Sequence, residues 1–306
     1  MGKRGWWVLG IGATLFFVFF IGCFWVFFRA ASGSHGHGSL GGSNKVGVIE
    51  IKGAIEDSKR ILDGIREFKE ARSLKAVVVR IDSPGGSVGP SQEIYDAVRD
   101  LGKTKKVVVS MGSIAASGGF YIACAGEKVF ANPGTLTGSI GVIFQIPNLQ
   151  GVMRWAGVQV NTIKAGKLKD TGNAFRDMTP EEREYLQSVL GDVHKQFIEA
   201  VAEGRKLKPS EVEPYADGRV FTGRQAKAWK LVDELGGFDA AVHSAFRMAG
   251  GKGEPELEYP EGENGLLRGL LGEEASSALG ATLRSLRAAA DLREPKFEYR
   301  LPLGGN

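Results

Sequence analysis

The stretch AVVVRIDSPGGS, residues 76–87, gives the strongest fold signal in this 306-residue chain. Its first half, residues 76–81, is mostly apolar and β-branched, which is typical of a strand buried on both faces. Its second half is rich in glycine, serine and proline, which end a strand in a turn. Parallel sheets build their functional sites in the loops at the carboxyl ends of their strands. The stretch therefore predicts a parallel sheet and the edge of it that carries the chemistry.

On either side of this stretch, short apolar runs alternate with helical patterns. The apolar runs predict strands at residues 46–51, 76–81, 107–109, 128–130, 139–144 and 158–163. Helical patterns over residues 58–71 and 91–101 separate the first three strands. This alternation implies an α/β fold with a mostly parallel sheet and helices on both faces.

The second half of the folded region is predicted to be mainly helical. A start signal at Thr179-Pro180 opens a long helix that runs to about residue 206, and helical patterns continue to residue 249. Residues 250–265 are rich in glycine, glutamate and proline and are predicted to loop out. Residues 266–292 could form an amphipathic helix.

The N-terminus predicts a membrane anchor. Residues 6–28 are almost unbroken in apolar character and long enough to cross a bilayer as one helix. Lys3 and Arg4 precede them, which favours a cytoplasmic N-terminus and a folded domain on the other side of the membrane. A cleaved signal peptide and lipid attachment at Cys23 are the alternatives.

These features divide the chain into four parts. They are the cytoplasmic stub and anchor, a Gly/Ser linker, a folded domain and a C-terminal extension, at residues 1–30, 31–44, 45–250 and 251–306.

Charge and composition exclude several classes of partner. The 39 Lys and Arg residues exceed the 35 Asp and Glu residues only slightly and are scattered, so no nucleic acid is indicated. Cys23 and Cys124 provide neither a disulfide framework nor a thiolate metal site. His35 and His37 lie in the Gly/Ser linker, which makes a poor metal site. We expect neither a metal nor a cofactor.

Ser117 is the candidate nucleophile. It lies in a second glycine-rich junction, residues 111–119, between the small neighbours Ala116 and Gly118. Glycine pairs at such junctions let the backbone approach a ligand and direct its N–H groups at a developing oxyanion. The same pairs are also ordinary turn chemistry, and Ala-Ser-Gly-Gly could be a close-packed crossing of two elements.

The base for Ser117 is predicted to be a lysine. His194 and His243 fall in predicted helices rather than at strand ends, so a Ser-His-Asp triad is disfavoured. A lysine can act as a base near neutral pH when its surroundings lower its pKa by about 3 units. Lys164, Lys167 and Lys169 follow the predicted strand at residues 158–163 and would reach the functional edge of the sheet.

Several motifs resemble the short bacterial type of signal peptide peptidase A. They are DSPGGS at 82–87, SMGSIAASGGFY at 110–121, LTGSIGV at 136–142, IKAGKLKD at 163–170, ADGRVFTG at 216–223 and LVDELGG at 231–237. The resemblance covers about residues 45–249 and implies a Clp/crotonase-like fold.

The resemblance also implies roles for particular residues. Ser117 takes the place of the nucleophile, Lys169 that of the base, and Ser139 that of a serine that hydrogen-bonds the lysine. The oxyanion donors would be the backbone N–H groups of Gly118 and of Gly86, with Gly85 as the alternative to Gly86. Lys164 and Lys167 stay open as alternatives to Lys169.

The function implied is a membrane-anchored serine endopeptidase that degrades signal-peptide remnants and other short apolar peptides. It would cross the bacterial inner membrane once, with the catalytic domain outside the cytoplasm. The family forms rings, in which the serine of one subunit can face the lysine of its neighbour. The alternatives are a crotonase-type acyl-thioester enzyme and a non-catalytic membrane scaffold.

Overall fold

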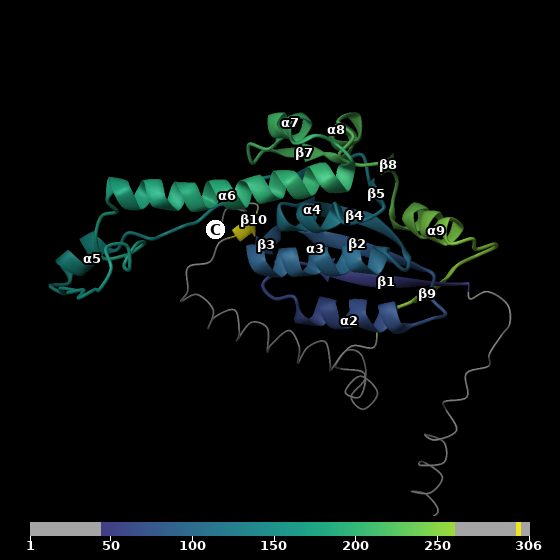
Figure 1. Cartoon of the computed structure of the whole chain (residues 1–306), viewed down its shortest axis with the longest axis horizontal. Coiled ribbons are helices and arrows are strands. Elements are labelled where there is room, and N and C mark those ends of the chain that lie inside the picture. Colours follow the sequence, from purple (N-terminus) through teal and green to yellow (C-terminus); the bar gives the residue numbers. More distant parts are fainter. Residues whose placement is uncertain (1–43, 261–297, 301–306) are drawn as a thin grey trace, which may run out of the picture. The chain divides into compact units, whose positions relative to one another are not determined.

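Eight strands form one sheet in the computed structural model, which describes residues 44–260 and 298–300 (Figure 1). Neighbouring strands run in the order β7–β6–β4–β2–β1–β9, and β5 and β8 extend the sheet beside β4. The strands are β1 Lys45–Lys52, β2 Ala76–Ser83, β4 Lys106–Ala116, β5 Lys128–Ala131, β6 Leu136–Gly138, β7 Val220–Thr222, β8 Glu234–Leu235 and β9 Glu256–Glu258. Every neighbouring pair is parallel except β6 and β7, which confirms the predicted α/β class.

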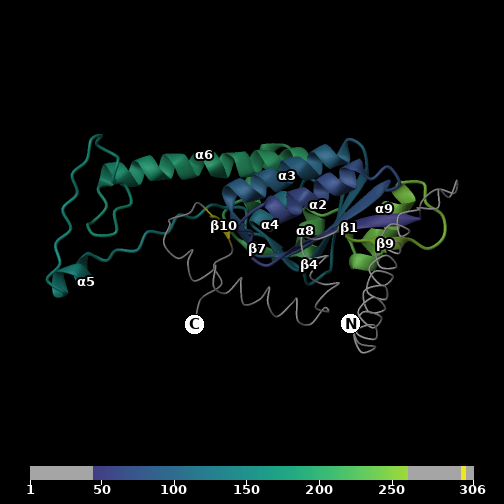
Figure 2. The same cartoon turned by 90° about the horizontal axis from the view of Figure 1, so that it is seen from below.

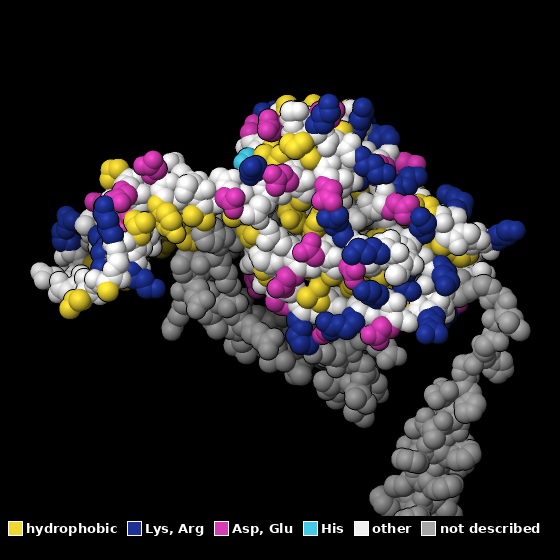
Figure 3. All heavy atoms as spheres, in the orientation of Figure 1, with side chains coloured by type: hydrophobic (Ala, Val, Ile, Leu, Met, Phe, Trp, Pro, Cys, Tyr) yellow, Lys and Arg dark blue, Asp and Glu magenta, His cyan; other side chains and the backbone are white. Residues whose placement is uncertain are grey.

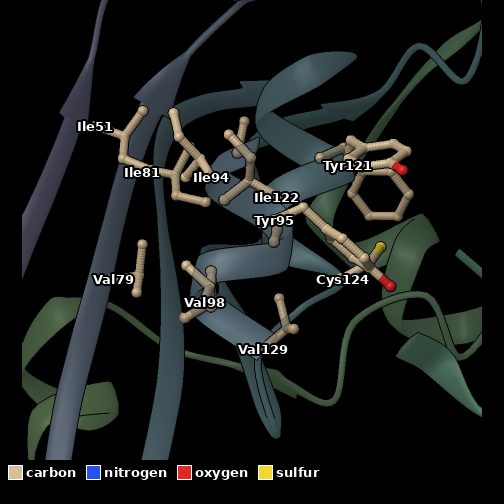
Figure 4. Packing of buried hydrophobic residues seen from close by; sticks show 14 of the residues in the cluster. Ile51, Val79, Ile81, Ile94, Tyr95, Val98, Tyr121, Ile122, Cys124 and Val129 are labelled. Atoms are coloured by element: carbon tan, nitrogen blue, oxygen red, sulfur yellow. The ribbon is translucent and has the colours of Figure 1, made fainter. Parts of the chain in front are cut away.

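Alternate residues of the central strands face two separate cores, and this is why these strands are continuous apolar runs in the sequence. In β2, Val77, Val79 and Ile81 belong to the larger core, whereas Ala76 and Val78 belong to the smaller one. Helices α2 Lys59–Glu70, α3 Val88–Gly102 and α4 Gly118–Ala123 cover the larger core. Figure 4 shows side chains of α3 and α4 beside those of β1 and β2. Helix α9 Phe238–Met248 covers the smaller core.

Strand β4 bends beside Asp82, where its pairing with β2 changes register. Ile81 pairs with Met111 and Ser83 pairs with Ala115, so an advance of two residues along β2 corresponds to an advance of four along β4. The Oδ1 atom of Asp82 accepts a hydrogen bond from the N–H of Ile114 at 3.1 Å. A β-carbon at Gly112 would lie 2.7 Å from Asp82 Cγ, so the bulge closes around this carboxylate. The first half of β4 pairs with β5 and its last residues pair with β6.

Helix α6 Pro180–Arg205 joins the sheet domain to an arm, which we define as residues 145–179 and which contains α5 Gln150–Trp155. The buried residues of α6, Glu182 apart, lie between Phe197 and Arg205. No residue of the arm is buried. Figures 1 and 2 show the arm and the N-terminal half of α6 extending away from the sheet. The remaining helices, α7 Pro209–Val212, η1 Glu213–Tyr215 and α8 Gly223–Ala228, follow α6.

Three expectations about strands were wrong. Residues 139–144 form none of the named strands, because the strand in this region, β6, ends at Gly138. Residues 158–163 also form none and lie in the exposed arm. Their β-branched side chains favour an extended chain, but a strand also needs a neighbour to pair with. The predicted loop after residue 250 contains β9, which pairs with β1.

Two predicted segments lie outside the described residues. They are the membrane anchor at residues 6–28 and the amphipathic helix at residues 266–292. Within residues 44–260 and 298–300, no helix has both the length and the apolar character needed to cross a bilayer.

The docking of α6 on the sheet domain can be tested with two glycines of that helix. A β-carbon at Gly204 would lie 2.0 Å from the carbonyl oxygen of Cys124, whereas one at Gly191 meets nothing within 4 Å. Gly204→Ala should therefore lower the free energy of unfolding by about 1–3 kcal/mol. Gly191→Ala should raise it by about 0.5–1 kcal/mol, because alanine favours the helix. Urea unfolding measures both changes; an equal effect of the two substitutions would contradict this packing.

Candidate active site

Ser117 joins the end of β4 to the start of α4. Its backbone angles, φ 53° and ψ −119°, are rare for a residue other than glycine and store about 1–3 kcal/mol of strain. Two hydrogen bonds of 2.8 Å fix this turn: the N–H of Ser117 donates to the carbonyl of Gly138, and its own carbonyl accepts from the N–H of Tyr121. The Ser117 side chain thus has a defined direction, and the residue is only 1% exposed.

Gly118 and Gly86 bring two backbone segments together beside Ser117. A β-carbon on Gly118 would lie 2.5 Å from Ser91 Oγ and 3.3 Å from the backbone nitrogen of Gly86. A β-carbon on Gly86 would lie 2.1 Å from the carbonyl oxygen of Ile55. Gly86 cannot hold a side chain without a backbone shift, and a side chain at Gly118 would displace the Ser91 hydroxyl. The close approach brings the backbone segments of the two predicted oxyanion donors together.

Gly85 is a poorer donor than Gly86, because its N–H already donates to Ser83 Oγ at 3.1 Å. The two residues that flank Gly86 both bond to the backbone of Ile55: the carbonyl of Gly85 accepts from the N–H of Ile55, and the N–H of Ser87 donates to the carbonyl of Ile55. Since successive residues of a strand direct their N–H and C=O groups to opposite sides, the N–H of Gly86 points away from Ile55.

A short antiparallel strand lies on that other side. It is β10 Glu298–Arg300, which pairs with β3 Gly85–Ser87 so that Tyr299 lies opposite Gly86 (Figure 1). By the alternation just described, the main chain of residue 299 faces the N–H and C=O groups of Gly86. The edge of β3 beside Ser117 thus accepts an extended peptide.

Ser139 also lies beside Ser117, because it directly follows Gly138 of β6. It has a positive φ of 52° and is 5% exposed, and its N–H donates to the carbonyl of Arg219 at 2.8 Å. The two serines therefore come from adjacent strand ends, each in a backbone conformation that is unusual for its residue type.

The Ser117 hydroxyl is buried and has no hydrogen-bond partner among the described residues. Such a group destabilises a fold by about 1–3 kcal/mol. Neither histidine of the described residues is a partner of this hydroxyl. As predicted, both lie in helices: His194 in α6, and His243 in α9, where His243 faces Asp239 and Glu254. The described residues contain no cluster of three or more His, Cys, Asp or Glu that could hold a metal ion.

The three candidate lysines lie on the arm and not at the edge of the sheet, because the strand expected before them is absent. Two of them pair with acids: Lys164 with Asp170 and Lys167 with Glu181. Lys169 is exposed, and no hydrogen bond or ion pair of its side chain occurs within the described residues. The structure does not bring Lys169 next to Ser117 of its own chain.

Some contributors to this site are not among the residues singled out from the sequence. Asp82 shapes the bulge of β4, and Ser91 packs against Gly118 while its hydroxyl donates to the carbonyl of Ser87 at 2.8 Å. Asp82 opens the DSPGGS motif, but the motif does not show that its carboxylate bonds β4, and no motif includes Ser91. Glu182 was detectable, because Thr179 and Glu182 have the spacing of a helix capping box.

The chain is similar to known peptidases. Residues 99–250 match "Peptidase family S49" and residues 45–137 match "Clp protease". A Synechocystis protein named "Putative protease" is 42% identical over 257 residues, covering 83% of this chain and 92% of the relative. "Serine protease SPPA, chloroplastic" of Arabidopsis thaliana is 32% identical, covering 69% of this chain and 33% of the relative. "Putative signal peptide peptidase SppA" of Enterococcus faecium is 30% identical, covering 78% and 74%.

Proposed function

This chain belongs to peptidase family S49, and we propose that it is a membrane-anchored serine endopeptidase in which Ser117 and Lys169 form the catalytic dyad. The observation that carries the proposal is the buried, unpartnered hydroxyl of Ser117 next to the close backbone approach of Gly86 and Gly118. Relatives named as a serine protease and as SppA support the class of reaction.

In the proposed reaction, Ser117 Oγ attacks the carbonyl carbon of a peptide bond and its proton passes to the neutral amine of the lysine. The carbonyl oxygen becomes negative and accepts hydrogen bonds from the N–H groups of Gly86 and Gly118. The lysine then gives the proton to the leaving amine, and an acyl ester remains on Ser117. Water, deprotonated by the same lysine, hydrolyses this ester and restores the serine.

The lysine in this scheme comes from a neighbouring copy of the chain. The arm that carries Lys169 exposes large apolar side chains, and Figure 3 shows yellow side chains at several places on it. The exposed residues are Leu149, Val152, Trp155, Val158, Val160, Ile163 and Phe175. Trp155 is 89% exposed and Ile163 is fully exposed, which is unfavourable in water and typical of a surface that a partner covers. A ring of copies would cover the arms and bring each Lys169, with Ser139 orienting it, to a neighbouring Ser117.

The proposed substrates are extended apolar peptides, including the signal-peptide remnants left in a membrane after secretion. The pairing of β3 with the extended segment β10 supports this, because main-chain pairing with a strand suits an unfolded peptide of many sequences. The apolar residues 6–28 after Lys3 and Arg4 support an anchor in the bacterial inner membrane with the catalytic domain outside the cytoplasm.

The dyad can be tested by labelling and kinetics. A fluorophosphonate probe should label Ser117, and Ser117→Ala should lose the label. Lys169→Ala should lower kcat for peptide hydrolysis by about three orders of magnitude or more, because the base is lost. Lys167→Ala is the matched control and should keep its activity. A fully active Lys169→Ala would move the base to Lys164 or Lys167, and turnover of a thioester but no peptide would favour a crotonase-type enzyme.

A shared site can be tested by mixing two inactive variants. Ser117→Ala keeps Lys169, and Lys169→Ala keeps Ser117. When the two are dissociated, mixed and reassembled, part of the wild-type activity should return, because some sites then combine the intact serine of one chain with the intact lysine of another. Each variant reassembled alone is the control. If the mixture stays inactive although mixed oligomers form, each dyad lies within one chain.

Substrate binding along β3 predicts competition with β10. Tyr299→Pro removes the N–H that faces Gly86 and should weaken the pairing of β10 with β3. We expect KM for a peptide substrate to fall while kcat stays unchanged. Glu298→Ala keeps the backbone N–H and serves as the control. An unchanged KM in Tyr299→Pro would mean that substrate does not occupy this edge.

A further inference from the structure

Four charged side chains connect the Lys169 region of the arm to the first turn of α6. Lys164 pairs with Asp170, and Arg176 pairs with both Asp170 and Glu182, so the charges alternate along an unbroken chain. Asp170 directly follows Lys169 in the sequence. The network therefore begins one residue from the proposed base.

Arg176 is the centre of this network. Its Nε atom donates to Asp170 Oδ2 at 3.1 Å, and its Nη2 atom donates to the backbone carbonyl of Asp170 at 3.2 Å. On its other side, Nη1 donates to Glu182 Oε2 at 2.8 Å and to the carbonyl of Asp177 at 3.0 Å. The planar guanidinium thus holds the side chain and the main chain of Asp170 on one side and Glu182 on the other, a fixed fork that the single ammonium group of a lysine does not reproduce.

Both carboxylates in the network are shielded from water. The side chains of Asp170 and Glu182 are 12% and 4% exposed. The hydrogen bond from Lys164, followed by that from Arg176, lowers the pKa of Asp170 to about 2. The hydrogen bond from Arg176, followed by that from the N–H of Thr179, lowers the pKa of Glu182 to about 2. Both acids stay ionised at neutral pH, so the network stays intact there.

Glu182 also anchors the network to α6. Its carboxylate accepts the N–H of Thr179 at 2.9 Å, and its own N–H donates to Thr179 Oγ1 at 3.2 Å, which forms a capping box. The other end of the same helix is buried against the sheet domain. A rigid path of contacts therefore runs from the sheet through α6, Glu182 and Arg176 to the residue after Lys169.

We infer that Arg176 is a positioning residue for Lys169: it holds the arm so that the amine of Lys169 reaches the neighbouring Ser117, and it neutralises the adjacent carboxylate. This inference rests on the proposed function. The arm has no buried residues of its own that could fix the geometry. A misplacement of about 1 Å in a catalytic group can lower a rate about 100-fold.

The second role is electrostatic. Without the charge of Arg176, Asp170 would keep only Lys164 as a cationic partner, and its carboxylate would stabilise the ammonium form of a neighbouring amine more strongly and so oppose its use as a base. The charged groups beside Lys169 and along this network are Lys164, Lys167, Asp170, Arg176 and Asp177 on the arm and Glu181, Glu182 and Arg183 on α6. Removing the charge of Arg176 makes the net charge of this region more negative by one unit.

The test compares Arg176→Gln, Arg176→Lys and Arg183→Gln in the full-length chain. Arg176→Gln should lower kcat about 10- to 100-fold with little change in KM, and should move the acidic limb of the pH–rate profile to higher pH. Arg176→Lys keeps the charge but not the bridge, so it should lose part of the rate and keep the native pH profile. Arg183→Gln removes the same charge from an exposed neighbour of Glu182 and should behave like the wild type.

Two outcomes would overturn the inference: native kinetics in Arg176→Gln, or a rate loss in it with an unmoved pH profile, which a merely structural role would produce. Size-exclusion chromatography and circular dichroism check that each variant folds and assembles. If Arg176→Gln fails to fold or assemble, the kcat of Arg176→Lys is the deciding measurement, and a native kcat there would contradict the inference. Lys169→Ala is measured in parallel. If that variant is inactive while Arg176→Gln is normal, the dyad stands and only the positioning role fails.

Discussion

The candidate site depends on a backbone approach that only glycine permits. Gly86 lies against the carbonyl of Ile55, and Gly118 lies against both Ser91 and the nitrogen of Gly86. A side chain at Gly86 would clash with the backbone of Ile55, and one at Gly118 would displace the Ser91 hydroxyl and press on the backbone of Gly85 and Gly86. The close approach thus places the backbone of Gly86 beside the residue that follows Ser117. The rest of the sheet domain holds this meeting point: the bulge at Asp82 directs the end of β4, and β6 fixes the turn at Ser117.

The single chain leaves this site incomplete. Ser117 has a strained backbone and a buried hydroxyl without a partner, both of which lower stability. The arm exposes apolar side chains and carries the one candidate lysine that no acid neutralises. These features are unfavourable separately but become favourable together if a second copy covers the arm and supplies the base. Assembly and catalysis would then depend on the same contacts.

The sequence predicted the central sheet well and the periphery poorly. Residues 46–51 and 76–81 were recognisable because strands that are buried on both faces are apolar throughout. Residues 158–163 have a similar β-branched composition, yet they lie in the exposed arm, since a pattern of side chains does not show whether a neighbouring strand is present. The placement of the three lysines at the sheet edge was wrong for the same reason.

The sequence by itself determined the fold class, the glycine-rich junctions, the choice of Ser117 and the exclusion of the histidines. Each of these follows from local composition and order along the chain. Only the tertiary structure decided that the N–H of Gly85 donates to Ser83 Oγ whereas Gly86 lies opposite Tyr299 of β10, that Lys164 and Lys167 are paired while Lys169 is not, and that Arg176 ties the arm to α6. These facts depend on which groups meet across long separations in the chain. Hydrogen bonds and ion pairs act over a few ångströms, so local sequence cannot show which partners come within their reach.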